Sequence, residues 1–193
     1  MRSFSTIFLL FLVTLLSSCG SDYVPKPRGY YRIDFPKHEY QVFDSSFPYT
    51  FEYPVYARIL RDSSNISEPY WLNIVYPSFH AQLHLSYKGV KNNLANYLED
   101  ARKLVNKHIP KANAILQREY LDPQHRVYGL VYDIKGSDAA STCQFYLTDS
   151  VTNFVRGALY FNLVPNNDSL SPVIDFLKTD LEHMIATFRW KNR

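Results

Sequence analysis

The chain has 193 residues, a length that suits one globular domain with a sizeable core. Its formal net charge is +3 at pH 7, from 21 Lys and Arg residues against 18 Asp and Glu residues. This near-neutral balance argues against a nucleic-acid binder, which would show a clustered basic face. Aromatic residues make up 16% of the chain, and such residues favour β-strands.

Residues 1–18 predict a secretory signal peptide. Arg2 supplies a positive start, an almost unbroken apolar run extends from Phe4 to Leu16, and small residues follow. The apolar run is too short to span a bilayer comfortably, because a spanning helix needs about 20 apolar residues. The exit from Leu16 to Cys19 resembles a bacterial lipobox, in which the Cys thiol receives a diacylglycerol and the chain is cut before it. The alternative is an ordinary secretory peptide that happens to contain a Cys.

Lipidation of Cys19 predicts a membrane anchor outside the cytoplasm. One fatty chain binds a membrane only marginally, whereas a diacylglycerol with an added acyl group such as palmitate holds firmly. Only one acidic residue lies near Cys19, so an acidic surface-export tag is not evident and the periplasmic side is favoured. The other cysteine, Cys143, is then left without an intrachain partner. It shares a predicted strand face with Phe145 and Leu147, which predicts a buried, unreactive thiol.

Residues 19–36 predict an extended arm between the lipidated Cys and a single globular domain at residues 37–193. Prolines in the arm fix φ and bias their neighbours to extended backbone. One hypothesis is that the arm docks on a partner; the other is that its aromatic residues pack into its own domain. Arg and Tyr are enriched at binding hot spots. The candidate partner-binding residues are therefore Arg28, Tyr30, Tyr31 and Arg32.

The rest of the chain alternates between two hydrophobic periods, two residues for strands and 3.6 for helices. The short connections between the later strands predict an antiparallel meander, because parallel strands need long crossovers. The predicted elements, in chain order, are strands within 38–60, a polar loop at 61–68, a hairpin at 70–88 turning at Pro77, a helix at 92–108, strands at 114–121, 126–135, 141–148 and 153–164, and a helix at 172–188.

The last helix is predicted to begin at Pro172, with Ser171 as its cap. Both helices carry an apolar stripe on one side, so each is expected to pack on the sheet. The predicted fold class is α+β, an antiparallel sheet of about six or seven strands with two amphipathic helices packed on it. This order of elements resembles the Mog1/PsbP-like sandwich.

Few residues point to chemistry. His80 and His84 are spaced for a metal on a helix, but here they fall on a predicted strand, where four residues span about 13 Å. No metal site, cofactor or catalytic motif is predicted.

Ser150 and Ser169 each follow an Asp and precede an aliphatic residue, which resembles the O-glycosylation signal of Bacteroidota envelope proteins. Both serines fall in predicted loops, and the other reading is that such Asp-Ser pairs simply form turns.

The chain closely resembles the GldD family of gliding-motility lipoproteins of Bacteroidota, nearly end to end. The most specific pieces are the lipobox at Cys19, the arm at residues 25–36, the run Arg156-Gly157-Ala158-Leu159-Tyr160-Phe161-Asn162, and residues 187–190. The resemblance implies an envelope protein required for surface gliding, a machinery that shares parts with the type IX secretion system. It implies no enzymatic activity, cofactor or catalytic residue.

Two functional hypotheses follow from these patterns. The leading one is a non-catalytic, lipid-anchored accessory protein that binds or stabilises other gliding-machinery envelope lipoproteins. The alternative is a binding module for envelope glycan, with exposed Tyr and Trp residues as stacking platforms.

Replacing Cys19 with Ala tests the lipid anchor. We expect the Cys19→Ala chain to fold but to leave the membrane fraction, because the acyl chains supply the membrane affinity. Fractionation and intact-mass analysis of the wild-type protein check this expectation. A mature wild-type chain that keeps an unmodified Cys19 would contradict it.

Overall fold

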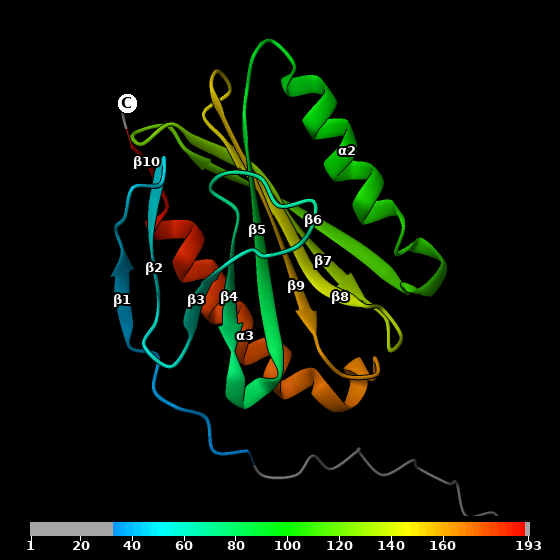
Figure 1. Cartoon of the computed structure of the whole chain (residues 1–193). Coiled ribbons are helices and arrows are strands. Elements are labelled where there is room, and N and C mark those ends of the chain that lie inside the picture. Colours follow the sequence, from blue (N-terminus) through cyan, green and yellow to red (C-terminus); the bar gives the residue numbers. More distant parts are fainter. Residues whose placement is uncertain (1–32, 192–193) are drawn as a thin grey trace, which may run out of the picture. The chain divides into compact units, whose positions relative to one another are not determined.

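The computed structural model describes residues 33–191 and shows two antiparallel sheets and two long helices (Figure 1). The signal peptide predicted at 1–18 and most of the predicted arm lie outside the described residues. The predicted α+β class is confirmed, with seven strands in the larger sheet.

The larger sheet contains every strand of the predicted hairpin and meander. Its order is β3-β4-β5-β9-β8-β7-β6, and each neighbouring pair is antiparallel. The meander β6 to β9 is confirmed, and β9 then pairs with β5, which joins the two halves of the chain. The strands are β3 (Arg58–Arg61), β4 (Leu72–Tyr76), β5 (Ala81–Gly89), β6 (Ala114–Asp122), β7 (Val127–Lys135), β8 (Ser141–Thr148) and β9 (Asn153–Phe161).

The smaller sheet joins the two ends of the domain. Strand β1 (Tyr40–Phe43) pairs with β2 (Tyr49–Pro54), and β2 also pairs with the two-residue strand β10 (Arg189–Trp190). The alternation predicted for residues 49–53 is observed, since Tyr49 and Phe51 are buried in the core. The C-terminal strand therefore lies beside the first strands of the domain.

Helix α2 (Leu94–Asn106) and helix α3 (Asn167–Thr187) cover opposite faces of the larger sheet (Figure 1). Strand β9 shows why: Val155 packs in the main core with α3, while its neighbour Phe154 packs with Ala101 of α2. Successive side chains of a strand point to opposite faces of the sheet. Each helix therefore packs on the side chains of one face only. Both helices predicted from the 3.6-residue period are confirmed.

The start predicted for α3 is wrong by five residues. The helix begins at Asn167, and the side chain of Asn166 accepts a hydrogen bond from the Ser169 backbone N–H. Asn167 also donates its side-chain amide to two carbonyls of the β7–β8 loop, at 2.7 and 2.9 Å. Pro172 consequently lies inside the helix. The stretch from Asn166 to Ser169 is itself rich in capping residues, and the competing Ser171-Pro172 signal concealed it.

The buried, free thiol predicted at Cys143 is confirmed. Cys143 is 2% exposed and lies in the main core with Phe145 and Leu147. Burial, with the charge of Asp133 adding to it, raises the pKa of the Cys143 thiol to about 12. The thiol therefore stays protonated at neutral pH, and the reactive thiolate is suppressed.

A buried carboxylate on α3 fastens the first described residues to the domain. Asp180 is 1% exposed and accepts hydrogen bonds from His38 Nδ1 at 2.7 Å, from the Tyr40 hydroxyl at 3.1 Å and from the Tyr56 hydroxyl. Burial, and then the charge of Asp180, raises the pKa of Tyr40 to about 12, so its hydroxyl remains a donor. One helix turn away, Phe176 stacks against the rings of Phe35 and His38, with centroids 4.4 and 4.3 Å apart.

Replacing Asp180 with Asn tests this carboxylate. The side-chain shape is kept, but one oxygen becomes an NH₂ group that opposes a buried donor, which costs about 1–3 kcal/mol for each unsatisfied group. We expect the melting temperature to fall by about 2–4 °C for each kcal/mol lost. Asp175→Asn on the exposed side of α3 is the matched control. Equal melting temperatures for the two variants would contradict a stabilising role for Asp180.

Candidate functional site

The sequence-predicted site residues fall into two groups. Cys19 and the four candidate partner-binding residues of the arm, Arg28, Tyr30, Tyr31 and Arg32, lie outside the described residues. Ser150 and Ser169 are both exposed. Ser150 lies in the β8–β9 turn with φ at 68°, as expected for a loop residue. Ser169 lies in the first turn of α3, so its predicted loop position is wrong, because α3 begins at Asn167.

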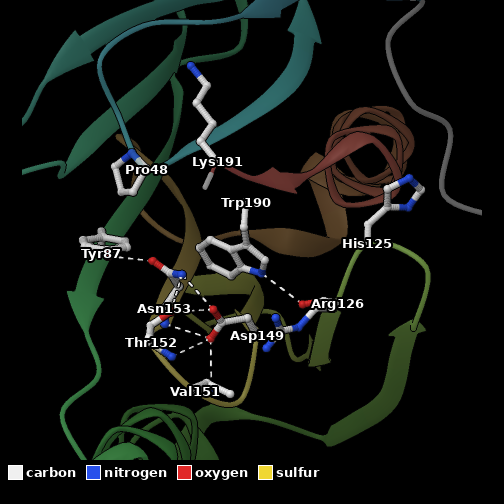
Figure 2. A pocket seen from close by; sticks show the side chains of 10 residues that line it. All are labelled: Pro48, Tyr87, His125, Arg126, Asp149, Val151, Thr152, Asn153, Trp190 and Lys191. Carbon is white, nitrogen blue, oxygen red and sulfur yellow. Dashed lines mark hydrogen bonds between the residues drawn. The ribbon is translucent and has the colours of Figure 1, made fainter. Parts of the chain in front are cut away.

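A pocket opens where the β8–β9 turn, the β6–β7 turn and strand β10 meet (Figure 2). Its volume is about 470 Å³. These segments are far apart in the sequence and are brought together because β10 pairs with β2 at one end of the domain. The pocket is lined by Pro48, Tyr87, His125, Arg126, Asp149, Val151, Thr152, Asn153, Trp190 and Lys191.

The Trp190 ring is the central apolar surface of this pocket (Figure 2). Its backbone pairs with Tyr49, and its ring meets the buried Phe188 edge-on at 4.8 Å. Its indole N–H donates to the Arg126 carbonyl at 3.2 Å. Arg126 has φ at 55°, a left-handed conformation that lets the β6–β7 turn present this carbonyl to the ring. Phe188 and the Arg126 carbonyl thus fix the Trp190 ring, and part of the ring faces the pocket.

Asp149 lines the pocket and organises the β8–β9 turn. Its carboxylate accepts backbone N–H bonds from Val151, Thr152 and Asn153 at 2.8–2.9 Å, and side-chain bonds from Thr152 and Asn153 at 2.7 Å (Figure 2). Burial alone would raise the pKa of Asp149, but these donors outweigh it and hold the pKa well below its usual range. The Asp-Ser pair at 149–150 therefore does form a turn.

The other charged groups of the pocket are mostly engaged as well. His125 Nδ1 lies 2.7 Å from Asp122, and Lys191 pairs with Asp44. The Tyr87 hydroxyl donates to Asn153 at 2.8 Å. Within residues 33–191, the Arg126 guanidinium has no carboxylate within ion-pair distance. A pocket with a fixed indole, one unpaired cation and many polar groups suits binding, because aromatic faces and placed polar groups are what such sites use.

The sequence identified two segments of this pocket but did not predict that they meet. Thr187 to Trp190 and the Asp-Ser turn at 149–150 were each visible as motifs, but they lie about forty residues apart and nothing in the sequence joins them. His80 and His84 are not brought together as ligands, since His80 occupies a left-handed turn and His84 lies in β5. Across the described residues, no group of three or more His, Cys, Asp or Glu side chains is arranged to hold a metal ion.

The fold and the pocket together define a small α+β domain with an aromatic, polar pocket at one end. None of the helices in the described part of the chain has the length and apolar character needed to cross a membrane. The sequence matches the family described as gliding motility lipoprotein GldD over residues 20–190, and the chain belongs to this family. Membership assigns it a role in gliding motility and, as a lipoprotein, an association with the cell envelope.

No curated protein matches the chain. Among solved structures, the chain is similar to the solution structure of cyanobacterial PsbP (CyanoP) from Synechocystis sp. PCC 6803, with 12% sequence identity and a TM-score of 0.49. That similarity covers 92% of this chain and 99% of the cyanobacterial one.

Replacing Asp149 with Asn tests the turn. An ionised side chain whose pKa is lowered by folding stabilises the fold above its unfolded pKa of about 3.9, and this contribution disappears as pH falls through the folded pKa. We expect Asp149→Asn to cost about 1–3 kcal/mol at pH 7, and the difference from wild type to shrink below about pH 4. Denaturant unfolding between pH 3 and 7 measures it, with the exposed Asp138→Asn as control. A difference that does not change with pH would contradict the assigned carboxylate role.

Proposed function

We propose that this protein is a non-catalytic, lipid-anchored accessory component required for gliding motility. In this proposal it faces the periplasm and binds or stabilises other components of the gliding and type IX secretion apparatus, chiefly envelope lipoproteins. Family membership supports the gliding role, and the pocket at Trp190 supports binding.

The engagement of the pocket's titratable groups is the observation that carries the binding proposal. Asp149 receives five hydrogen bonds from its own turn, and His125 is held by Asp122. A general base must have a lone pair within reach of the proton that it removes. The five donors of the turn occupy the Asp149 carboxylate, whereas His125 uses only Nδ1 in its contact with Asp122. Both residues shape the turns around the Trp190 ring, and a fixed aromatic ring among such turns is the arrangement of a binding surface.

The arm supports a tethered mode of action. Phe35 and His38 pack on α3, so the domain is held at a fixed point immediately after the arm. Asp34 lies fifteen positions after Cys19, and an extended chain of that length reaches about 50 Å at most. A lipidated Cys19 would therefore keep Asp34 within that reach of the membrane. In this proposal Arg28, Tyr30, Tyr31 and Arg32 contribute to binding the same partner as the domain.

A photo-crosslinking amino acid at Val151 tests the binding surface in living cells. Val151 lines the pocket and its side chain is 56% exposed, while its backbone N–H keeps the bond to Asp149 after substitution. Leu60 on the edge strand β3 is 54% exposed and is the matched control. We expect a discrete protein adduct from position 151 that position 60 does not give. Adduct patterns that do not differ between the two positions would contradict a partner at the pocket.

Glycan binding is the second candidate, and one observation favours it. The rings of Trp190 and Tyr87 line the same polar pocket, as expected for a surface on which sugar rings stack. The same crosslinking experiment separates the candidates. Material attached to position 151 that resists protease and yields sugars on hydrolysis would support the glycan module, whereas a protease-sensitive adduct supports the protein partner.

A further inference from the structure

A second polar cluster lies on the face of the larger sheet that α2 partly covers. It is centred on Arg156 of β9, two residues after Phe154, which packs on α2. Arg156 pairs in register with Ser86 of β5 and Tyr146 of β8, so it stands near the middle of the sheet. Its side chain is partly buried, and within residues 33–191 no carboxylate lies within ion-pair distance of its guanidinium. An arginine in this position is a cation without a counter-charge.

The groups around Arg156 are polar but neutral. Its guanidinium donates to the Gln144 side-chain oxygen at 2.5 Å, and Gln144 is 1% exposed. That bond turns the Gln144 amide NH₂ toward His108, whose Nε2 lies 2.8 Å away. The amide must donate, so His108 Nε2 accepts and the ring is neutral. Burial, and then the charge of Arg156, lowers the pKa of His108 in agreement with this assignment.

A third side of the cluster is formed by His84 and Tyr160. Their rings meet edge-on at 5.6 Å, and Tyr160 lies close enough to Arg156 to favour the charged form of its guanidinium. Burial lowers the pKa of His84, although the charge of Asp62 opposes this shift. Asn73 faces His84 across the strand pair, and its buried side-chain oxygen has no hydrogen-bond partner among the described residues. The Gln144 oxygen that accepts from Arg156 is neutral, and the nearby His84 and Tyr160 rings add no carboxylate.

Taking a charge out of water without a partner is costly, and buried charges are normally paired. We propose that the cluster of Arg156, Gln144, His108, His84 and Tyr160 is a binding site for a carboxylate group. A planar guanidinium matches a carboxylate geometrically. The charges also match, since one carboxylate neutralises one arginine. A phosphate dianion would leave an excess negative charge near Asp62, which already acts on His84.

This site is separate from the pocket at Trp190. Asn153 contributes to that pocket and bonds to Asp149 and Tyr87, whereas Arg156 stands on the opposite face of β9, which Phe154 shares. The carboxylate site therefore goes beyond the proposed function, and either can fail without the other. It also gives a role to Arg156 and Tyr160, two residues of the run at 156–162, which is one of the four most specific pieces of the family resemblance.

Thermal unfolding of the full detergent-solubilised lipoprotein tests the proposal with sodium acetate as the probe. We expect acetate to raise the melting temperature saturably relative to sodium chloride of equal ionic strength, because a ligand that binds only the folded state stabilises it. Inorganic phosphate should give less stabilisation. A short peptide with a free C-terminal carboxylate, compared with its C-terminal amide, shows whether a peptide end or a free organic acid is preferred; selective binding of either acid form supports the site.

Two variants assign the effect to the cluster. Arg156→Gln should weaken acetate binding at least tenfold, and the exposed Arg58→Gln is the matched control that should not. Gln144→Glu keeps the arginine but places a carboxylate of the chain itself beside it, so it should also abolish acetate binding while the protein stays folded. Three results would overturn the proposal: no saturable acetate effect in the wild type, wild-type acetate binding in both cluster variants, or phosphate stabilisation that equals or exceeds that of acetate.

Discussion

The carboxylate of Asp180 is the point on which the arrangement of the domain depends. It is buried on α3 and binds donors from His38, Tyr40 and Tyr56, which belong to the first described segment, to β1 and to the turn before β3. A buried carboxylate must be satisfied by donors. The three donors come from residues 124 to 142 positions away, so meeting this requirement places the N-terminal part of the domain on the last helix.

That placement determines where the pocket forms. The segment that Asp180 holds leads into β1 and β2, and β2 accepts β10 as its second neighbour. Strand β10 follows α3 directly, after Phe188, which is fully buried among Tyr49 and Phe51. Trp190 is therefore presented at the end of the sheet, opposite the turn that Asp149 organises. Successive aromatic contacts and one buried carboxylate thus connect the N-terminal segment with the candidate binding surface.

The family motif at residues 156–162 also has a physical explanation in the two-faced sheet. Gly157 faces the main core, where the Phe145 ring fills the space and a Cβ would lie 2.2 Å from it. Leu159 packs in the same core, while Arg156 and Tyr160 stand on the other face. One short strand thus combines a packing requirement with a polar cluster, and a motif of this kind need not describe a single site.

The sequence by itself determined the secondary structure and the fold class. The periods of two and 3.6 residues located both helices and the meander, and the strand around Cys143 predicted its burial, because these properties depend on neighbours along the chain. It misplaced the start of α3, where two capping signals compete. Only the tertiary structure decided the Asp180 contacts, the pocket at Trp190 and the Arg156 cluster. Each of these three features joins side chains from distant segments of the chain. Local hydrophobic periodicity cannot predict which distant segments will pack together.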